Sequence, residues 1–331
     1  MTTDIYDITI IGGGPTGLFA GFYAGMRQAK TKIIESLPHI GGQLSLLYPE
    51  KYIYDVAGFP KIKAQELIDQ LEEQIKPFHH TICLGEEVLM FDKKSDLIHI
   101  KTSKGTHLTK TLIIACGKGS FQPKRLTLPH IDHHEGKQLH YFIQDMNQFR
   151  DKDIMICGGG DSAVDWALML EDIARQVYLV HRRHEFRAHE HSINSLKQSK
   201  ISVKTPFIVE SLLENNGILD SVEINNPRED IRETIHIDDL LVNYGFSSSL
   251  GPIKEWPIEK KRQTILTNSS TETSNSGVYA IGDISSYEGK VHLIATGFGE
   301  APIAVNHAMN YINPKERIQP MHSTSLFEQD S

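Results

Sequence analysis

Residues 8–17 read ITIIGGGPTG and join a short β-rich run to a glycine-rich turn. An apolar pattern with helical spacing follows over residues 18–26. Strand, Gly-x-Gly-x-x-Gly turn and helix in this order are typical of a dinucleotide-binding α/β unit. We expect Gly12 to permit the tight turn, Gly14 to let the backbone approach a pyrophosphate, and Gly17 to let the helix pack against the strand.

An acidic residue ends the next apolar run. Glu35 follows residues 32–34 and lies 18 residues after Gly17. At this position a carboxylate accepts hydrogen bonds from a ribose 2′-hydroxyl and repels a 2′-phosphate, so the first turn suits FAD. The alternative is a glycine-rich turn that binds nothing. The predicted FAD contacts in this part of the chain are Gly12, Gly14, Thr16, Gly17 and Glu35.

A second stretch, IMICGGGDSA at residues 154–163, repeats the pattern with alanine in the third position, which still allows close helix packing. The next strand-like run, residues 177–180, leads into arginines and has no acid at its end. A guanidinium group can bind phosphate oxygens through two parallel hydrogen bonds, which suits the 2′-phosphate of NADP. The alternative is a solvated basic surface. The predicted NADP contacts are Gly158, Gly160, Ala163, Arg182, Arg183 and Arg187.

Length and composition limit the possible classes. The 331 residues predict two domains, and a formal net charge of −8 argues against a general nucleic-acid binder. The chain begins with a few polar residues and a strand-like run in place of a signal peptide, and it has no apolar stretch of the ~20 residues that a membrane span needs. We therefore expect a cytoplasmic protein without a membrane or nucleic-acid partner.

Cysteine and histidine spacing gives no metal or disulfide signature. Cys83, Cys116 and Cys157 form no Cys-x-x-Cys pair, and buried thiols are the expected outcome. The 17 histidines lack the spacing of a zinc site with cysteine partners, so no metal is predicted.

Further motifs extend over nearly the whole chain: IIGGGP at 10–15, IGGQ at 40–43, LYP at 47–49, DVAGFP at 55–60, IACG at 114–117, HRR at 181–183, FRA at 186–188 and YAIGD at 279–283. With these motifs the chain resembles flavoproteins that have two dinucleotide-binding domains, most closely the thioredoxin-reductase-like ferredoxin–NADP reductases. The resemblance implies two Rossmann-like three-layer α/β domains. An NADP domain, residues 119–248, would be inserted into an FAD domain formed by residues 1–118 and 249–331, with short crossings at 117–123 and 244–252.

The resemblance also implies roles around the flavin. Gln43 and Asp283 would form hydrogen bonds with the flavin and its ribityl chain, Val88 would contact adenine through its backbone, and Phe121 would pack near the flavin. Tyr48 would stack on the ring. The helix that begins near residue 296 would point its positive amino end at the flavin.

The C-terminal stretch has two possible interpretations. From the residues alone, a polar tail after Pro320 is typical of a frayed end. The resemblance instead implies that His322 stacks on the other flavin face and that Thr324 forms a hydrogen bond beside it. We hypothesise that the partner subunit of a homodimer supplies this tail.

The route of the electrons is predicted from an absence. Relatives that reduce thioredoxin carry a Cys-x-x-Cys pair shortly before the second glycine-rich turn, whereas this chain has no cysteine between Cys116 and Cys157. Electrons must then leave directly from the flavin. We predict hydride transfer from NADPH to FAD and single-electron transfer to ferredoxin or flavodoxin, with no proton-donating residue. The alternatives are an NADPH-dependent flavin, disulfide or oxygen reductase, and a non-catalytic nucleotide-binding redox sensor.

Overall fold

The computed structural model describes residues 4–129, 131–315 and 317–319. It divides the chain into two compact units, Met1–Ser120 with Ser248–Ser331 (unit 1) and Phe121–Ser247 (unit 2). The two connecting segments, β9 (Ser120–Pro123) and β18 (Phe246–Ser249), pair as a two-stranded sheet.

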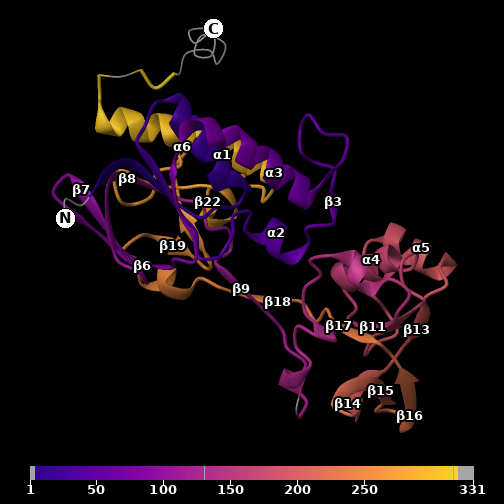
Figure 1. Ribbon diagram of the computed structural model, residues 1–331. Helices are drawn as coiled ribbons and strands as arrows, with labels where there is room; N and C mark the ends of the chain where they lie inside the picture. Colours follow the sequence, from indigo (N-terminus) through magenta and orange to yellow (C-terminus); the bar gives the residue numbers. More distant parts are fainter. Residues whose placement is uncertain (1–3, 130, 316, 320–331) are drawn as a thin grey trace. The chain divides into compact units, whose positions relative to one another are not determined.

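Unit 1 is built on a seven-stranded sheet with the order β5-β2-β1-β8-β7-β6, in which β21 also pairs with β8 (Figure 1). The strands β5, β2, β1 and β8 pair in parallel, as does β21 with β8, whereas β7 and β6 continue the sheet antiparallel. The strands are β1 (Ile5–Ile11), β2 (Thr31–Ile34), β5 (Thr81–Cys83), β6 (Val88–Lys94), β7 (Leu97–Thr102), β8 (Thr106–Ile114) and β21 (Val278–Ala280).

The described residues of unit 1 also form four α-helices and several short elements. The helices are α1 (Pro15–Met26), α2 (Gln43–Leu47), α3 (Ala64–Ile75) and α6 (Ile294–Ile312). The short strands are β3 (Tyr52–Ile53), β4 (Ile62–Lys63), β19 (Lys260–Lys261), β20 (Thr264–Leu266) and β22 (Ser285–Ser286). The 3-10 helices are η1 (Lys76–Phe78), η4 (Gly251–Glu255) and η5 (Gly282–Ile284).

Unit 2 is built on a five-stranded parallel sheet with the order β10-β17-β11-β12-β13 and a separate three-stranded antiparallel sheet, β14-β15-β16. Its strands are β10 (Leu139–His140), β11 (Asp153–Cys157), β12 (Gln176–Val180), β13 (Ser202–Lys204), β14 (Ile208–Asn215), β15 (Ile218–Asn226), β16 (Ile231–His236) and β17 (Asp239–Val242). Its helices are α4 (Asp161–Leu170), α5 (Glu190–Gln198), η2 (Ile131–His133) and η3 (Met146–Phe149).

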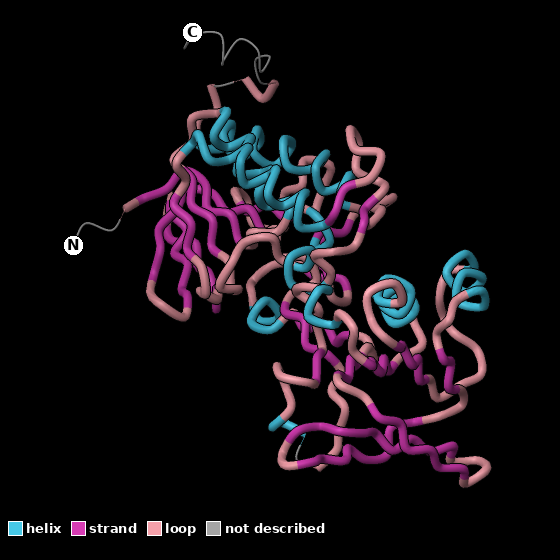
Figure 2. Tube along the Cα trace, turned by 45° about the vertical axis from the view of Figure 1, so that its right-hand side comes forward, coloured by secondary structure: helices cyan, strands magenta, loops and turns pink. Residues whose placement is uncertain are grey.

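Within each unit, helices lie along one face of the parallel sheet (Figure 2). The predicted α/β class is therefore confirmed, and both predicted turns follow parallel strands, β1 and β11. Among the described residues, no helix has both the length and the apolar character of a membrane span.

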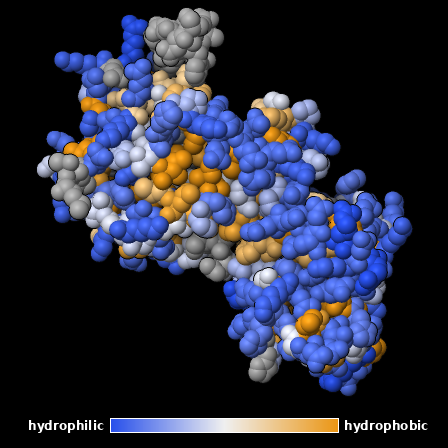
Figure 3. Space-filling model, in the orientation of Figure 1, coloured by the Kyte–Doolittle hydropathy of each residue, from blue (hydrophilic) through white to orange (hydrophobic). Residues whose placement is uncertain are grey.

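Polar residues cover most of the visible surface of each unit (Figure 3), and the apolar side chains gather on both faces of each sheet. In β1, Ile8 and Ile10 pack toward the helices, whereas Ile11 belongs to the cluster on the opposite face. In β11, Ile154 and Ile156 pack toward α4. This alternation is the period-two pattern of a strand that is buried on both sides.

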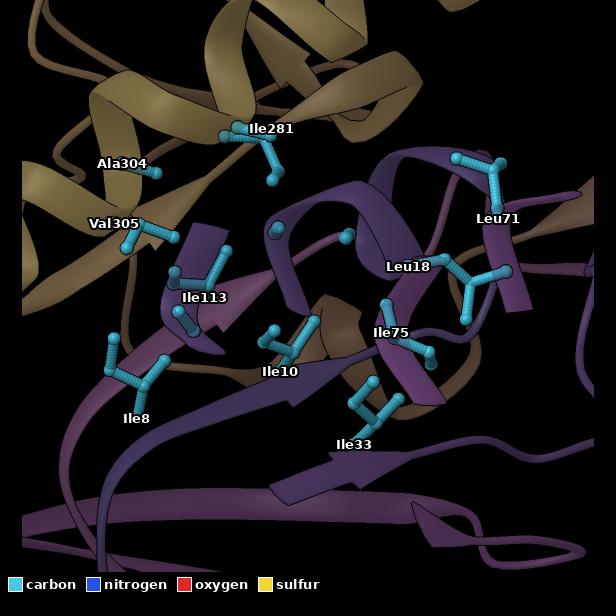
Figure 4. Close-up of a cluster of buried hydrophobic side chains, with 14 of the residues drawn as sticks. Ile8, Ile10, Leu18, Ile33, Leu71, Ile75, Ile113, Ile281, Ala304 and Val305 are labelled. Atoms are coloured by element: carbon cyan, nitrogen blue, oxygen red, sulfur yellow. The ribbon is translucent and has the colours of Figure 1, made fainter. Parts of the chain in front are cut away.

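The helix-side cluster of unit 1 joins segments that are far apart in the sequence. Figure 4 shows Ile10 and Ile113 of the sheet near Leu18 of α1, with Val305 of α6 in the same cluster. Because α1 and α6 share this core, the glycine-rich turn before α1 and the loop before α6 lie at the same edge of the sheet.

Candidate functional site

In the first glycine-rich turn, two glycines are closed positions, which have no room for a Cβ atom, and one glycine is an open position, which faces empty space. A Cβ atom at Gly12 would lie 2.6 Å from the Ala115 carbonyl oxygen, and one at Gly17 would lie 2.0 Å from the Gly12 carbonyl oxygen. A Cβ at Gly14 would meet nothing within 4 Å. Gly14 is also the residue before the first turn of α1, with extended backbone at φ −74°. Open space therefore lies at Gly14, where the free amide groups of the first helical turn begin.

Glu35 is held at this turn by backbone amides. Its side chain is 6% exposed, and its Oε2 accepts a 2.7 Å hydrogen bond from the Gly13 amide. Its Oε1 accepts a 2.9 Å hydrogen bond from the Leu37 amide. Hydrogen bonds between amides and a carboxylate are of the strong, charge-assisted kind. The carboxylate is thus fixed at the carboxyl end of β2, beside the glycine-rich turn.

The segment that carries Gln43 packs on the same turn. A Cβ at Gly42 would lie 3.1 Å from the Gly14 Cα atom, and one at Gly117 would lie 2.9 Å from Gln43 Nε2. Gly42 has φ +57°, in the left-handed region that favours glycine. The structure therefore brings Gln43 to the edge of the sheet at which Gly14 lies.

Asp283 and Tyr48 lie close enough to interact. Asp283 belongs to η5, which follows β21, and Tyr48 ends α2. Burial, and secondly the charge of Asp283, raises the pKa of Tyr48 above its ordinary value, so the ring stays uncharged at neutral pH. His292 Nδ1 lies 3.7 Å from Asp283 Oδ1.

Thr16 is the meeting point of α1 and the segments around α6. A Cβ at Gly282 would lie 3.1 Å from Thr16 Oγ1, and one at Gly297 would lie 2.3 Å from the same oxygen. Glycine at both positions lets the Asp283 turn and the first turn of α6 approach α1 this closely.

Sequence reasoning missed a buried carboxylate behind this turn. Glu300 accepts a 2.7 Å hydrogen bond from the Gly282 amide and forms a buried ion pair with Lys290. The helix that begins near residue 296 was predicted, but no role was assigned to Glu300; a glutamate inside an apolar helix was the signal that could have revealed the pair.

Of the remaining predicted FAD residues, the structure describes some and leaves others undescribed. Val88 is buried at the start of β6, and the Glu86 amide two residues earlier donates to the Glu35 carbonyl oxygen at 2.9 Å, which places this segment next to the Glu35 strand end. Phe121 belongs to β9, and its side chain is not described. His322 and Thr324 lie outside the described residues.

The second glycine-rich turn repeats the arrangement of the first. A Cβ at Gly158 would lie 2.4 Å from the Asn243 carbonyl oxygen and 2.7 Å from the Ala163 Cβ. A Cβ at Gly160 would meet only the Arg187 carbonyl oxygen, at 3.9 Å. As in the first turn, the open position directly precedes the helix, here α4.

The predicted arginines gather beside this second turn. The Arg187 amide donates to the Gly159 carbonyl oxygen at 2.7 Å, and all three arginine side chains are exposed. Burial lowers the pKa of His181, and the charges of Arg182, Arg183 and Arg187 lower it further. Within the described part of the chain, none of the three arginines forms an ion pair, so their guanidinium groups are available to an anionic ligand.

The cysteines offer no reactive thiolate. All three are free; burial raises the pKa of the Cys83 thiol, and it raises the pKa of Cys116 and of Cys157 to about 12. Among the described residues, no group of three or more His, Cys, Asp and Glu side chains is arranged to hold a metal ion.

Comparison with known proteins places this geometry in a family. The family described as pyridine nucleotide-disulphide oxidoreductase matches residues 6–308. The ferredoxin–NADP reductase 2 of Listeria monocytogenes serotype 4b (strain F2365) is 59% identical over 98% of this chain and 99% of its own length. The ferredoxin–NADP reductase of Enterococcus faecalis (strain ATCC 700802 / V583) is 55% identical over 98% of this chain and 97% of its own length.

Among solved structures, the thioredoxin reductase of Lactococcus lactis (FR conformation) has a TM-score of 0.74 and 24% identity. The match covers 93% of this chain and 99% of that one. At this level of sequence identity, the similarity shows only that the two proteins share a fold.

Alanine substitutions at Gly14 and Gly17 should differ in their effect on stability, because Gly14 is the open position of the turn and Gly17 is a closed one. We expect Gly14→Ala to change the free energy of unfolding by less than about 1 kcal/mol, because its Cβ meets open space at an ordinary φ. Gly17→Ala should cost about 3 kcal/mol, because its Cβ would overlap the Gly12 carbonyl oxygen. Urea unfolding followed by circular dichroism measures both. Equal losses in the two variants would contradict this account of the turn.

Proposed function

Because the chain belongs to the pyridine nucleotide-disulphide oxidoreductase family, we propose that this flavoprotein oxidoreductase passes electrons from NADPH through FAD to ferredoxin or flavodoxin. The observation that carries the proposal is the contrast between the two glycine-rich turns. A buried carboxylate, Glu35, is bound to the first, whereas three exposed arginines gather beside the second. The names of the full-length relatives support the acceptor.

The residues of unit 1 fit an FAD molecule. We assign the pyrophosphate to the open side of Gly14, where the amino end of α1 offers amide groups and a positive helix end. Glu35 would accept hydrogen bonds from the adenosine ribose, and Val88 would contact adenine through its backbone. In the bound cofactor, the isoalloxazine ring supplies the chemistry, since it accepts a hydride and releases electrons one at a time.

The flavin end of the site would lie between Tyr48, Gln43 and Asp283. Gln43 and Asp283 would hold the flavin and its ribityl chain by hydrogen bonds. Tyr48 would present an uncharged ring for stacking, since burial and the charge of Asp283 raise its pKa. Phe121 would pack near the ring. The amino end of α6 would place a positive helix end there. Hydride transfer needs no acid or base from the protein, so these residues would only bind and orient.

The residues of unit 2 fit NADPH. The open side of Gly160 and the amino end of α4 would hold its pyrophosphate. Arg182, Arg183 and Arg187 would bind the 2′-phosphate, and a carboxylate in this position would repel it. Gly158 and Ala163 would set the close packing of the turn and helix.

Electrons would leave from the flavin directly. The chain has no cysteine between Cys116 and Cys157, and burial raises the pKa of both thiols to about 12. These thiols are therefore unsuited to relay electrons as a dithiol would.

The assembly and the C-terminal tail are part of the same proposal. We assign His322 and Thr324 to the second face of the flavin, with the tail supplied by the partner subunit of a cytoplasmic homodimer. Unit 1 carries exposed apolar side chains near and on α6, namely Val291, Leu293 and Ile303, which supports an interface on this unit.

An acceptor panel tests the proposed function. The purified protein should contain FAD, and NADPH should bleach its absorbance within one turnover. Ferredoxin should be reduced at least about tenfold faster than oxygen, a quinone or thioredoxin. A flavin that NADPH does not bleach would indicate a redox sensor without turnover. If oxygen, a quinone or a disulfide were reduced fastest, ferredoxin would not be the acceptor and the proposed function would be wrong on this point.

The arginines should determine the choice between NADPH and NADH. Arg182→Ala and Arg183→Ala should each raise the KM for NADPH by about 10- to 100-fold, since each loses a charged hydrogen bond worth about 1.5–3 kcal/mol. The KM for NADH should change by less than about twofold. Arg175→Ala is the matched control, because Arg175 is exposed in the same unit but pairs with Asp153 and Asp238. Equal effects on both nucleotides would argue against 2′-phosphate binding.

Truncation after Gln319 tests the tail. The truncated protein should keep bound FAD, while the flavin absorbance bands shift and turnover with ferredoxin changes. Mixing truncated subunits with full-length subunits that carry Tyr48→Ala should restore partial turnover only if the tail acts across a dimer. A spectrum and a turnover identical to the full-length protein would refute the assignment of His322 and Thr324.

A further inference from the structure

A buried ion pair lies at the edge of unit 1 where Asp283 is found. The side chains of Lys290 and Glu300 are 3% and 5% exposed, and the Lys290 ammonium group contacts Glu300 Oε1. Removing two charges from water costs more than their attraction usually returns, so a buried pair is weak evidence for stability. Its position and its hydrogen bonds suggest a different role.

The Glu300 carboxylate joins three segments. Its Oε2 accepts from the Gly282 amide at 2.7 Å, and its Oε1 accepts from the Tyr287 hydroxyl at 2.7 Å. Burial, and secondly the hydrogen bond to Glu300, raises the pKa of Tyr287 to about 12, so this hydroxyl remains a donor. Lys290 also donates to Ser285 Oγ at 3.0 Å. The pair therefore connects η5, the loop after β22 and α6.

The connected segments are those that position the flavin-side residues. Gly282, which donates to Glu300, directly precedes Asp283 and has φ +71°. The loop that carries Lys290 continues to His292, whose Nδ1 lies 3.7 Å from Asp283 Oδ1. Glu300 itself is in the second turn of α6, the helix whose first turn contacts Thr16.

We propose that Lys290 and Glu300 form a positioning pair that fixes the Asp283 turn and the amino end of α6 without adding net charge to the flavin site. The inference rests on the proposed function of unit 1 as the FAD-binding unit. Only a carboxylate offers enough acceptor sites for Gly282, Tyr287 and Lys290 together. Lys290 neutralises the charge that this carboxylate would otherwise place there.

Charge balance gives the pair a measurable signature. Reduction adds negative charge to the bound cofactor, so a nearby uncompensated charge shifts its reduction potential. Glu300→Gln keeps the shape and leaves Lys290 positive, which should raise the potential. Lys290→Met leaves Glu300 negative but still bound by Gly282 and Tyr287, which should lower the potential. A general loss of stability would not produce shifts of opposite sign.

The experiment measures the potential by equilibration with a redox dye and the dissociation constant of FAD by fluorescence quenching of the apoprotein. We expect both single variants to bind FAD about tenfold more weakly, because Glu300→Gln weakens the acceptor of the Gly282 amide and Lys290→Met removes the link from its loop to Ser285 and Glu300. The double variant Glu300→Gln with Lys290→Met should return the potential toward the wild-type value while FAD binding stays weak. Lys204→Met is the control, since it removes a lysine that pairs with Glu233 in unit 2.

Each outcome decides one of the two proposals. Wild-type protein that binds no FAD would overturn the proposed function, and this inference with it. Wild-type protein that binds FAD, with variant potentials that are unchanged or shifted in the same direction, would overturn the positioning pair alone. If a charge variant does not fold, Tyr287→Phe removes a single donor to Glu300 and should still weaken FAD binding. Unchanged FAD binding in that variant would refute the role.

Discussion

The packing of Gly17 against the Gly12 carbonyl oxygen, which leaves no room for a Cβ atom, is the constraint on which the site depends. Any side chain at Gly17 would push α1 away from β1. The same helix packs against α3 and α6 through the cluster that contains Leu18 and Val305. Displacing α1 would therefore disturb both the Glu35 carboxylate bound at the turn and the Gly282 turn that contacts Thr16. A single steric contact thus sets the position of charged groups that are distant in the sequence.

Unit 2 uses the same backbone geometry with the opposite electrostatics. Gly158 closes against the Asn243 carbonyl oxygen, and Gly160 remains open, as Gly12 and Gly14 do in unit 1. The two units differ at the end of the strand that follows the turn and its helix: this strand is followed by Glu35 in unit 1 and by arginines in unit 2. In the proposed function, a few side chains on an unchanged backbone would set the nucleotide preference, because each turn would bind only the pyrophosphate that FAD and NADPH share.

Buried charged groups occur at the glycine-rich-turn edge of one parallel sheet and at the opposite edge of the other. The edge at which each group lies indicates whether it is close to a predicted nucleotide site. In unit 2, Asp239 accepts from His140 and from Lys152 at 2.7 and 2.8 Å, at the start of β17 and thus at the edge opposite the glycine-rich turn. This cluster joins neighbouring strands away from the predicted nucleotide site. The Lys290–Glu300 pair lies instead at the edge where Asp283, Tyr48 and Thr16 meet, which is the edge at which open α/β sheets bind ligands.

The sequence by itself determined the features that depend on short stretches of chain. Strand, glycine-rich turn and helix are local patterns, so residues 8–17 and 154–163 predicted the α/β class that the structure confirms, and the motifs predicted the family that the comparison confirms. The spacing of Glu35 also predicted its place at the first turn, but only the tertiary structure decided that Tyr48 meets Asp283 and that Lys290 and Glu300 lie behind Gly282. The meeting of Tyr48 with Asp283 has no local signature, because β21 returns to the sheet beside β8 only after unit 2 has intervened in the sequence.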